Sequence, residues 1–99
     1  MQEHTVLFVD DEVNILKAIQ RLLRHEPMNV LTAARPEEAL ALLEKSEAQV
    51  VVSDQRMPGQ TGVELLTSAR NLSPHTLRML VTAYSDLKAA IDAINDGYV

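Results

Sequence analysis

Several residue types are scarce or absent in this 99-residue sequence, and each absence excludes a class of protein or site. The chain has no cysteine, which excludes a disulfide framework and a thiolate zinc site, and which fits a reducing compartment. It has only three glycines and no glycine-rich loop of the kind that binds nucleotide phosphates. We therefore expect neither a disulfide-stabilised secreted scaffold nor a nucleotide site of that type.

Basic charge and long apolar runs are also lacking. Nine lysines and arginines stand against 14 aspartates and glutamates, and the net charge of -5 argues against direct nucleic acid binding. The N-terminus has no basic region before its short apolar run, so it does not resemble a signal peptide. No apolar stretch approaches the ~20 residues needed to span a bilayer. These absences predict a cytoplasmic domain without membrane contact.

The residues that are present alternate between two patterns. The 46% hydrophobic content and the length predict one globular domain with one modest core. Short apolar runs predict strands over residues 5–9, 29–33, 48–54 and 76–83. Apolar residues at helical spacing predict helices over residues 13–26, 35–47, 63–72 and 85–97. This alternation predicts an α/β fold, a doubly wound parallel sheet with helices on both faces. The first strand is apolar throughout, which predicts that both of its faces are covered.

Polar side chains follow three of these strands at their carboxyl ends. The first strand runs into Asp10, Asp11 and Glu12, the third ends at Asp54, and the fourth carries Thr82. Ligands of open α/β sheets bind beyond this edge, so we expect the carboxylates to share one pocket. Carboxylate oxygens favour Mg²⁺ as the cation that relieves their repulsion. One carboxylate could then act as a nucleophile toward a phosphoryl group, with the Thr82 hydroxyl as a hydrogen-bond donor to its oxygens.

Each of these residues also has an ordinary explanation. The acidic run could be a solvated loop before a helix, Asp54 a turn residue, and Thr82 a helix cap. Each explanation is adequate for one residue alone. Their coincidence at one predicted sheet edge favours a functional site.

Three segments resemble the receiver domains of two-component response regulators. "VLFVDDE" is similar to the first strand and acidic pair of that family. "VVVSDQRMPGQTGVELL" is similar to its third strand, acceptor aspartate, Met-Pro loop and following helix, and "LRMLVTAYSD" to its fourth strand with a terminal threonine. The resemblance implies a flavodoxin-like receiver fold.

The resemblance also implies roles for individual residues. Asp54 resembles the phosphoacceptor, Asp11 a direct Mg²⁺ ligand, and Asp10 an outer-shell or second ligand, although these last two roles could be exchanged. The main-chain carbonyl of Arg56 resembles a third metal contact, and Thr82 the hydroxyl that follows the phosphoryl group. A sensor histidine kinase would be the phosphodonor, and a C-terminal output domain in the parent protein would regulate transcription or cyclic-dinucleotide metabolism. Such a domain is a switch and not a turnover enzyme.

The sequence departs from the family pattern at its C-terminal end. Receivers have a fifth strand with a lysine, then a fifth helix, whereas the lysines here are Lys17, Lys45 and Lys88, all on predicted helices. We therefore expect residues 1–99 to be a receiver domain with four strand–helix units and without the fifth. Phosphorylation of this chain would be weak or absent. The bare sheet edge and apolar face would favour a homodimer or a swapped oligomer.

Two other classes remain open. A Mg²⁺-dependent phosphatase or phosphotransferase with an aspartyl nucleophile also places carboxylates at strand ends, although such enzymes typically carry Asp-x-Asp on the first strand. A receiver-like domain that binds partners without phosphate is the third possibility. Turnover of a phosphomonoester would distinguish the enzyme from the other two.

Overall fold

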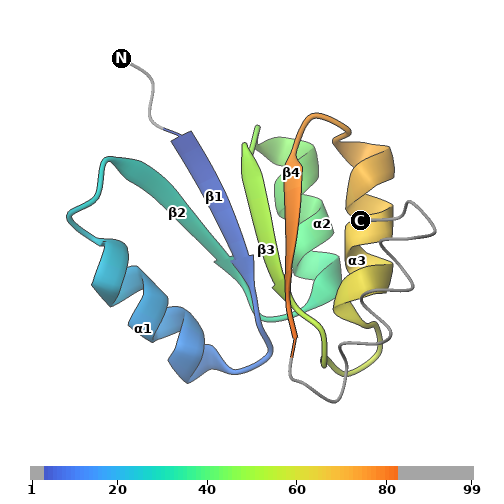
Figure 1. Ribbon diagram of the computed structural model, residues 1–99, viewed down its shortest axis with the longest axis horizontal. Helices are drawn as coiled ribbons and strands as arrows, with labels where there is room; N and C mark the ends of the chain where they lie inside the picture. The colour runs from blue at the N-terminus through green and yellow to red at the C-terminus, as the bar shows by residue number, and fades with distance from the viewer. Residues whose placement is uncertain (1–3, 83–99) are drawn as a thin grey trace.

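The computed structural model describes residues 4–82, which form a parallel sheet with helices on both faces (Figure 1). The strands are β1 (His4–Val9), β2 (Met28–Ala33), β3 (Val50–Asp54) and β4 (Leu77–Val81), in the spatial order β2-β1-β3-β4. The helices are α1 (Val13–Leu23), α2 (Pro36–Lys45) and α3 (Gly62–Leu72). The predicted α/β fold is confirmed for this part of the chain. The helix predicted over residues 85–97 lies outside the described residues.

The observed elements differ from the predicted ones mainly at their ends. The first helix was expected to reach residue 26 but ends at Leu23, where the amide of Glu26 donates to the Leu23 carbonyl at 3.0 Å. Pro27 explains the early stop, because proline disfavours helical backbone in the residue before it.

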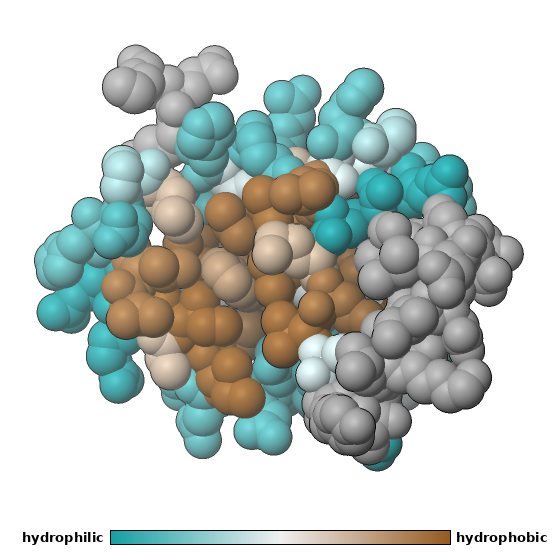
Figure 2. Space-filling view, viewed as in Figure 1, coloured by the Kyte–Doolittle hydropathy of each residue, from teal (hydrophilic) through white to brown (hydrophobic). Residues whose placement is uncertain are grey.

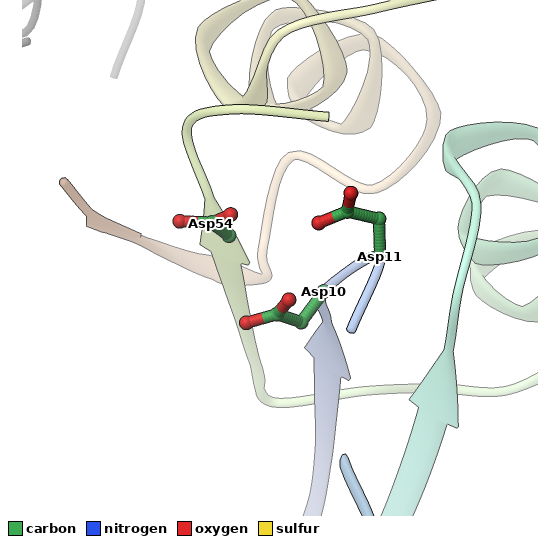
Figure 3. Close-up of side chains that lie close together, drawn as sticks. All are labelled: Asp10, Asp11 and Asp54. Carbon is green, nitrogen blue, oxygen red and sulfur yellow. The ribbon is translucent and has the colours of Figure 1, made fainter. Parts of the chain in front are cut away.

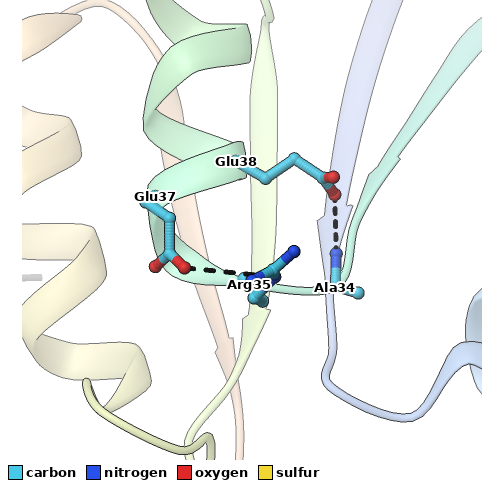
Figure 4. Close-up of polar contacts among 4 residues, drawn as sticks. All are labelled: Ala34, Arg35, Glu37 and Glu38. Atoms are coloured by element: carbon cyan, nitrogen blue, oxygen red, sulfur yellow. Dashed lines mark hydrogen bonds and ion pairs between the residues drawn. The ribbon is translucent and has the colours of Figure 1, made fainter.

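The start of α2 follows the predicted pattern. Pro36 occupies the first helical turn, where its missing N–H costs nothing, and Glu37 and Glu38 follow it. Glu38 reaches back to accept a hydrogen bond from the amide of Ala34 at 2.9 Å (Figure 4). Arg35 and Glu37 form a 4.0 Å ion pair with both side chains mostly exposed, so this pair contributes little stability.

The main core lies between the sheet and the helices α2 and α3. Alternate residues of β1 and β3 point to this side, and Leu7 and Val51 are fully buried there. They pack with apolar side chains of both helices, namely Ala39, Leu43, Leu65, Leu66 and Ala69. This layer makes the sheet rigid and thereby fixes where its strand ends lie.

The opposite face of the sheet carries α1, and its β3 and β4 part is apolar up to Asp54. Leu77, Met79 and Val81 alternate along β4 on this side and are 61%, 50% and 58% exposed. In Figure 2, seen from the same side as Figure 1, apolar side chains gather across this part of the molecule. The prediction that β1 is covered on both faces is therefore correct only for the face that packs against α2 and α3. On the other face Phe8 is half-buried, because α1 covers only part of the sheet.

No helix within residues 4–82 is long and apolar enough to cross a membrane.

Candidate metal and phosphoacceptor site

Strand pairing places two aspartates side by side at one edge of the sheet. β1 and β3 are parallel, with Val9 opposite Ser53, so Asp10 and Asp54 are the next residues along the two strands. The amide of Asp10 donates to the carbonyl of Ala33 at 3.1 Å, which extends the pairing with β2 past the end of β1. The backbone of the sheet thus determines the spacing of the two carboxylates.

Asp11 completes a cluster of three carboxylates. One oxygen from each of Asp10, Asp11 and Asp54 lies within 4.8 Å of the others (Figure 3). Asp11 is exposed, whereas Asp10 and Asp54 are half-buried. The Asp10 carboxylate also accepts a hydrogen bond from the amide of Glu12 at 2.9 Å, which orients it. Glu12 itself serves as the N-terminal cap residue of α1. The three aspartates therefore lie together at one sheet edge, as predicted, whereas Glu12 of the predicted acidic set is not part of the cluster.

The cluster fits a hard divalent cation. Octahedral Mg²⁺ holds oxygen ligands at about 2.1 Å, so neighbouring ligand oxygens are about 3 Å apart and opposite ones about 4 Å. The aspartate oxygens lie within 4.8 Å of one another, which is close to this range. The cluster consists of carboxylate oxygens alone, which Mg²⁺ prefers and soft metals do not. Asp10, Asp11 and Asp54 are thus the residues that would hold the ion.

Thr82 and Arg56 flank the cluster. Thr82 directly follows Val81, which is the partner of Asp54 in the β3–β4 register, so it lies at the same sheet edge and is half-buried. Arg56 lies in the loop after β3 and is exposed. It lines an open pocket of about 510 Å³ together with Gln55, Met57, Pro58 and Thr61. The predicted residues therefore gather at one edge, at the ends of three strands.

Two further depressions border the carboxylates. One of about 310 Å³ is lined by Asp11, Ala34, Arg35, Pro36, Glu37 and Pro58, and so combines charged and apolar side chains. A mainly apolar one of about 120 Å³ lies on the α1 side and includes Asp10, Asp54, Phe8, Val52 and Val81. The cluster is thus open to solvent on one side and borders the apolar face on the other.

Of the three lysines, two lie where the sequence predicts them. Lys17 is in α1 and Lys45 is the last residue of α2, so neither stands at a strand end. Lys88 lies outside the described residues. Within residues 4–82, no strand carries a lysine toward the aspartates.

Two further residues have contacts at the site that the sequence alone does not give, although Gly62 belongs to the segment that resembles the receiver Met-Pro loop and following helix. Gly62 begins α3 so close to β3 that a Cβ there would collide with the Asp54 carbonyl oxygen and would lie 2.7 Å from the Leu80 side chain. Gln55 is 7% exposed and forms hydrogen bonds with both α3 and β4. The glycine after the Met-Pro loop was a visible signal in the sequence, whereas nothing in the local pattern marked Gln55 as buried.

The start of α3 is closed by a reciprocal cap. The Thr61 hydroxyl accepts from the amide of Glu64 at 3.2 Å, and the Glu64 carboxylate accepts from the Thr61 amide at 3.0 Å. The Thr61 hydroxyl also donates to the Glu64 carboxylate at 3.0 Å, and the hydrogen bonds from the Thr61 backbone and hydroxyl lower the pKa of the Glu64 carboxyl. The cap fixes the loop that follows Asp54 to the helix.

A family model for the response regulator receiver domain matches residues 6–99. The chain belongs to this family. The flavodoxin-like receiver fold expected from the three sequence segments is therefore confirmed, and the chain is a receiver domain of the two-component type.

The relatives and structural neighbours of this receiver domain have different names and functions. The hydrogenase transcriptional regulatory protein HoxA of Cupriavidus necator is 40% identical over 95 residues, which are 96% of this chain and 20% of HoxA. A solved structure of an adenylate cyclase from Rhodopirellula baltica superposes with a TM-score of 0.92 at 35% identity, covering 99% of this chain and 73% of that one. The signal receiver domain of an HD domain-containing protein from Pseudomonas fluorescens Pf-5 superposes with a TM-score of 0.89 at 34% identity, over 99% and 78% of the two chains. The chain spans about a fifth of the length of the curated relatives it matches.

Proposed function

We propose that this receiver domain is a cytoplasmic phosphoacceptor switch in which Asp54 takes a phosphoryl group from a sensor histidine kinase. The observation that carries the proposal is the convergence of the oxygens of Asp10, Asp11 and Asp54 within 4.8 Å at one sheet edge. Asp54 is half-buried at the end of a central strand, where the backbone holds it in place. Asp10 and Asp11 would hold the ion together with one oxygen of Asp54, and the other Asp54 oxygen would be the nucleophile.

The transfer requires one bond to form and one to break. An oxygen of the Asp54 carboxylate attacks the phosphorus of a phosphohistidine, an O–P bond forms, and the N–P bond breaks with its electron pair remaining on the imidazole nitrogen. When bound, Mg²⁺ offsets the negative charge that the phosphoryl group brings to the carboxylates. Thr82, beside Asp54, donates its hydroxyl proton in a hydrogen bond to the acyl phosphate. This contact shifts a two-state equilibrium at the end of β4, and the domain signals without turning over a substrate.

The output of the switch is proposed from the relatives. HoxA and the other curated relatives are transcriptional regulators, which supports control of transcription by an attached output domain. The structural neighbours named for an adenylate cyclase and an HD domain-containing protein support nucleotide signalling as the alternative output. In either case nucleic acid contact would belong to the output domain, because this domain carries a net charge of -5.

The proposal is tested by metal binding and by phosphorylation. In a Mg²⁺ titration followed by amide NMR, the resonances of residues 10, 11 and 54 should shift first, and Asp54→Asn should weaken the binding. With a small acyl phosphate donor and Mg²⁺, the 99-residue chain should gain little phosphoryl mass, because within residues 4–82 no strand-end lysine is present to pair with the incoming group. Any gain should disappear in Asp54→Asn.

Two results would contradict this function. A phosphoryl gain of equal size in Asp54→Asn would place the acceptor elsewhere. Steady hydrolysis of a phosphomonoester that depends on Asp54 would support the phosphatase or phosphotransferase class instead.

A further inference from the structure

Gln55 is a buried polar residue whose contacts are not explained by metal binding or by the acceptor chemistry. It directly follows Asp54 and is 7% exposed. A glutamine at the start of a loop is usually solvated, since burying an amide is unfavourable unless its polar atoms are paired. The partners of Gln55 therefore explain its position.

Three polar groups of Gln55 each hold a neighbouring element. The backbone amide of Gln55 donates to the carbonyl of Val81 at 3.1 Å, at the end of β4. Its carbonyl accepts from the amide of Gly62 at 2.9 Å, and its side-chain Oε1 accepts from the amide of Val63 at 3.0 Å, both in the first turn of α3. One residue thus joins the acceptor strand to both β4 and α3.

The contacts with α3 satisfy groups that a helix cannot pair internally. The first N–H groups of a helix have no partner within it. In α3 the amides of Gly62 and Val63 are bound by Gln55, and that of Glu64 by the Thr61 hydroxyl. Gln55 therefore supplies two of these three acceptors. Loss of the side-chain amide group of Gln55 would leave the backbone amide of Val63 unpaired in a half-buried position.

The same junction is packed too closely to move independently of Asp54. Gly62 approaches the Asp54 carbonyl and the Leu80 side chain so nearly that even a methyl group would collide. The Ser53 hydroxyl also donates to the Asp54 carbonyl at 2.9 Å. A displacement of Val81, and of Thr82 after it, would therefore pull on the α3 turn through Gln55.

We propose that Gln55 is a positioning residue that holds Asp54 in metal-binding geometry and transmits its movement to the first turn of α3. This inference rests on the proposed function, because it assumes that Asp54 shares a Mg²⁺ ion with Asp10 and Asp11. Gln55 is hydrogen-bonded to β4 and to α3. It acts through Asp54 and the loop that follows it.

The test is a Mg²⁺ titration of the 99-residue chain followed by amide NMR. In the wild type, Mg²⁺ should shift the amides of residues 62–64 along with those of the aspartates. Gln55→Met keeps the size of the side chain and removes the acceptor, so it should weaken Mg²⁺ binding about 10-fold and abolish the α3 response. Gln55→Glu retains an acceptor oxygen and should restore the α3 response. Gln60→Met, the same substitution in the same loop, is the control and should behave as the wild type.

The outcomes separate this inference from the proposed function. Wild-type Mg²⁺ affinity and a wild-type α3 response in Gln55→Met would overturn the role of Gln55. A wild type that binds no Mg²⁺ would instead refute the proposed function. If Gln55→Met does not fold, hydrogen exchange of the metal-free wild type decides. Protection of the Val63 amide from exchange supports the positioning role of Gln55. A Val63 amide that exchanges like an unstructured amide overturns that role.

Discussion

At the scale of single residues, the site concentrates like charge. Asp10, Asp11 and Asp54 bring three carboxylate oxygens within 4.8 Å of one another. Two unit charges about 4 Å apart repel by about 1 kcal/mol in water. Strand pairing holds Asp10 and Asp54 in this arrangement, so a cation bound there would stabilise the fold by relieving the repulsion.

Asp11→Asn should therefore have opposite effects without and with the metal. In metal-free solution it should raise the free energy of unfolding by up to about 1 kcal/mol, because it relieves repulsion. Mg²⁺ at ten times its dissociation constant should stabilise the wild type by about 1.4 kcal/mol and the variant by much less. Urea unfolding with and without Mg²⁺ measures both effects. Glu44→Gln, an exposed carboxylate of α2, is the control, and equal Mg²⁺ stabilisation of all three proteins would contradict the site.

Gly62 is the second residue whose identity the site requires. A Cβ there would meet the Asp54 carbonyl and the Leu80 side chain, so Gly62→Ala should cost about 1–3 kcal/mol of stability and weaken Mg²⁺ binding. Gly59→Ala is the contrasting variant. Gly59 has a φ of 85° and open space around it, so alanine there should cost about 1–2 kcal/mol through backbone strain alone. Unfolding curves and Mg²⁺ titrations of both variants test the distinction, and unchanged Mg²⁺ affinity in Gly62→Ala would contradict it.

At the scale of elements, the start of α3 is the best-satisfied helix terminus in the described part of the chain. Its capping box joins Thr61 and Glu64 reciprocally, whereas the side chains of the cap residues of α1 and α2 form no capping hydrogen bond. The box fixes the loop between Asp54 and α3. Its strength depends on pH, because ionised Glu64 accepts the hydrogen bonds from Thr61.

The pKa of Glu64 is lower in the folded chain than in the unfolded chain, and this determines the direction of the pH effect. The contribution of ionised Glu64 is complete above the ordinary glutamate pKa of about 4.3 and is lost as the pH falls through the lower folded value. At neutral pH, Glu64→Gln should therefore lower the urea midpoint. The difference from the wild type should shrink as the solution is made acidic.

Glu37→Gln, in the first turn of α2, is the matched control for that measurement, because Glu37 is exposed and pairs only loosely with Arg35. The urea midpoint of Glu37→Gln should stay close to that of the wild type at every pH. A Glu64→Gln difference that grows in acid would contradict the capping role.

At the scale of the whole molecule, the two faces of the sheet differ. The face under α2 and α3 holds the buried core, whereas the α1 face presents Leu77, Met79 and Val81 to solvent in the described structure. Contiguous exposed apolar area of this kind promotes association. The β4 side chains continue this surface toward the depression that borders Asp54.

The 99-residue chain should therefore self-associate in solution. Its sedimentation coefficient should rise with concentration, and Met79→Lys should reduce that rise, because a charge on this face opposes apolar contact. Leu72→Lys provides the control, since Leu72 is 45% exposed but lies on α3, behind the other face. A wild type that sediments as a monomer at every concentration would refute the prediction.

Much of this architecture could be predicted from the sequence because local patterns carry it. The apolar runs that end at Val9 and Asp54 identified strands, and the spacing of apolar residues after Val13 identified a helix. Acidic residues directly after such strands predicted a cluster at the carboxyl edge. The least accurate predictions concerned the end of α1, where the effect of Pro27 reaches further back than predicted, and the coverage of β1, which depends on what packs nearby.

The sequence by itself determined which segments become strands or helices and that carboxylates stand at strand ends, because periodicity and burial preference are local properties. Only the tertiary structure decided the strand order β2-β1-β3-β4, which sets Asp10 beside Asp54. It also decided that Gln55 turns inward to bind Val63 and that Gly62 lies against the Asp54 backbone. These relations join residues through pairing and packing across different elements, and no local pattern of residue types specifies them.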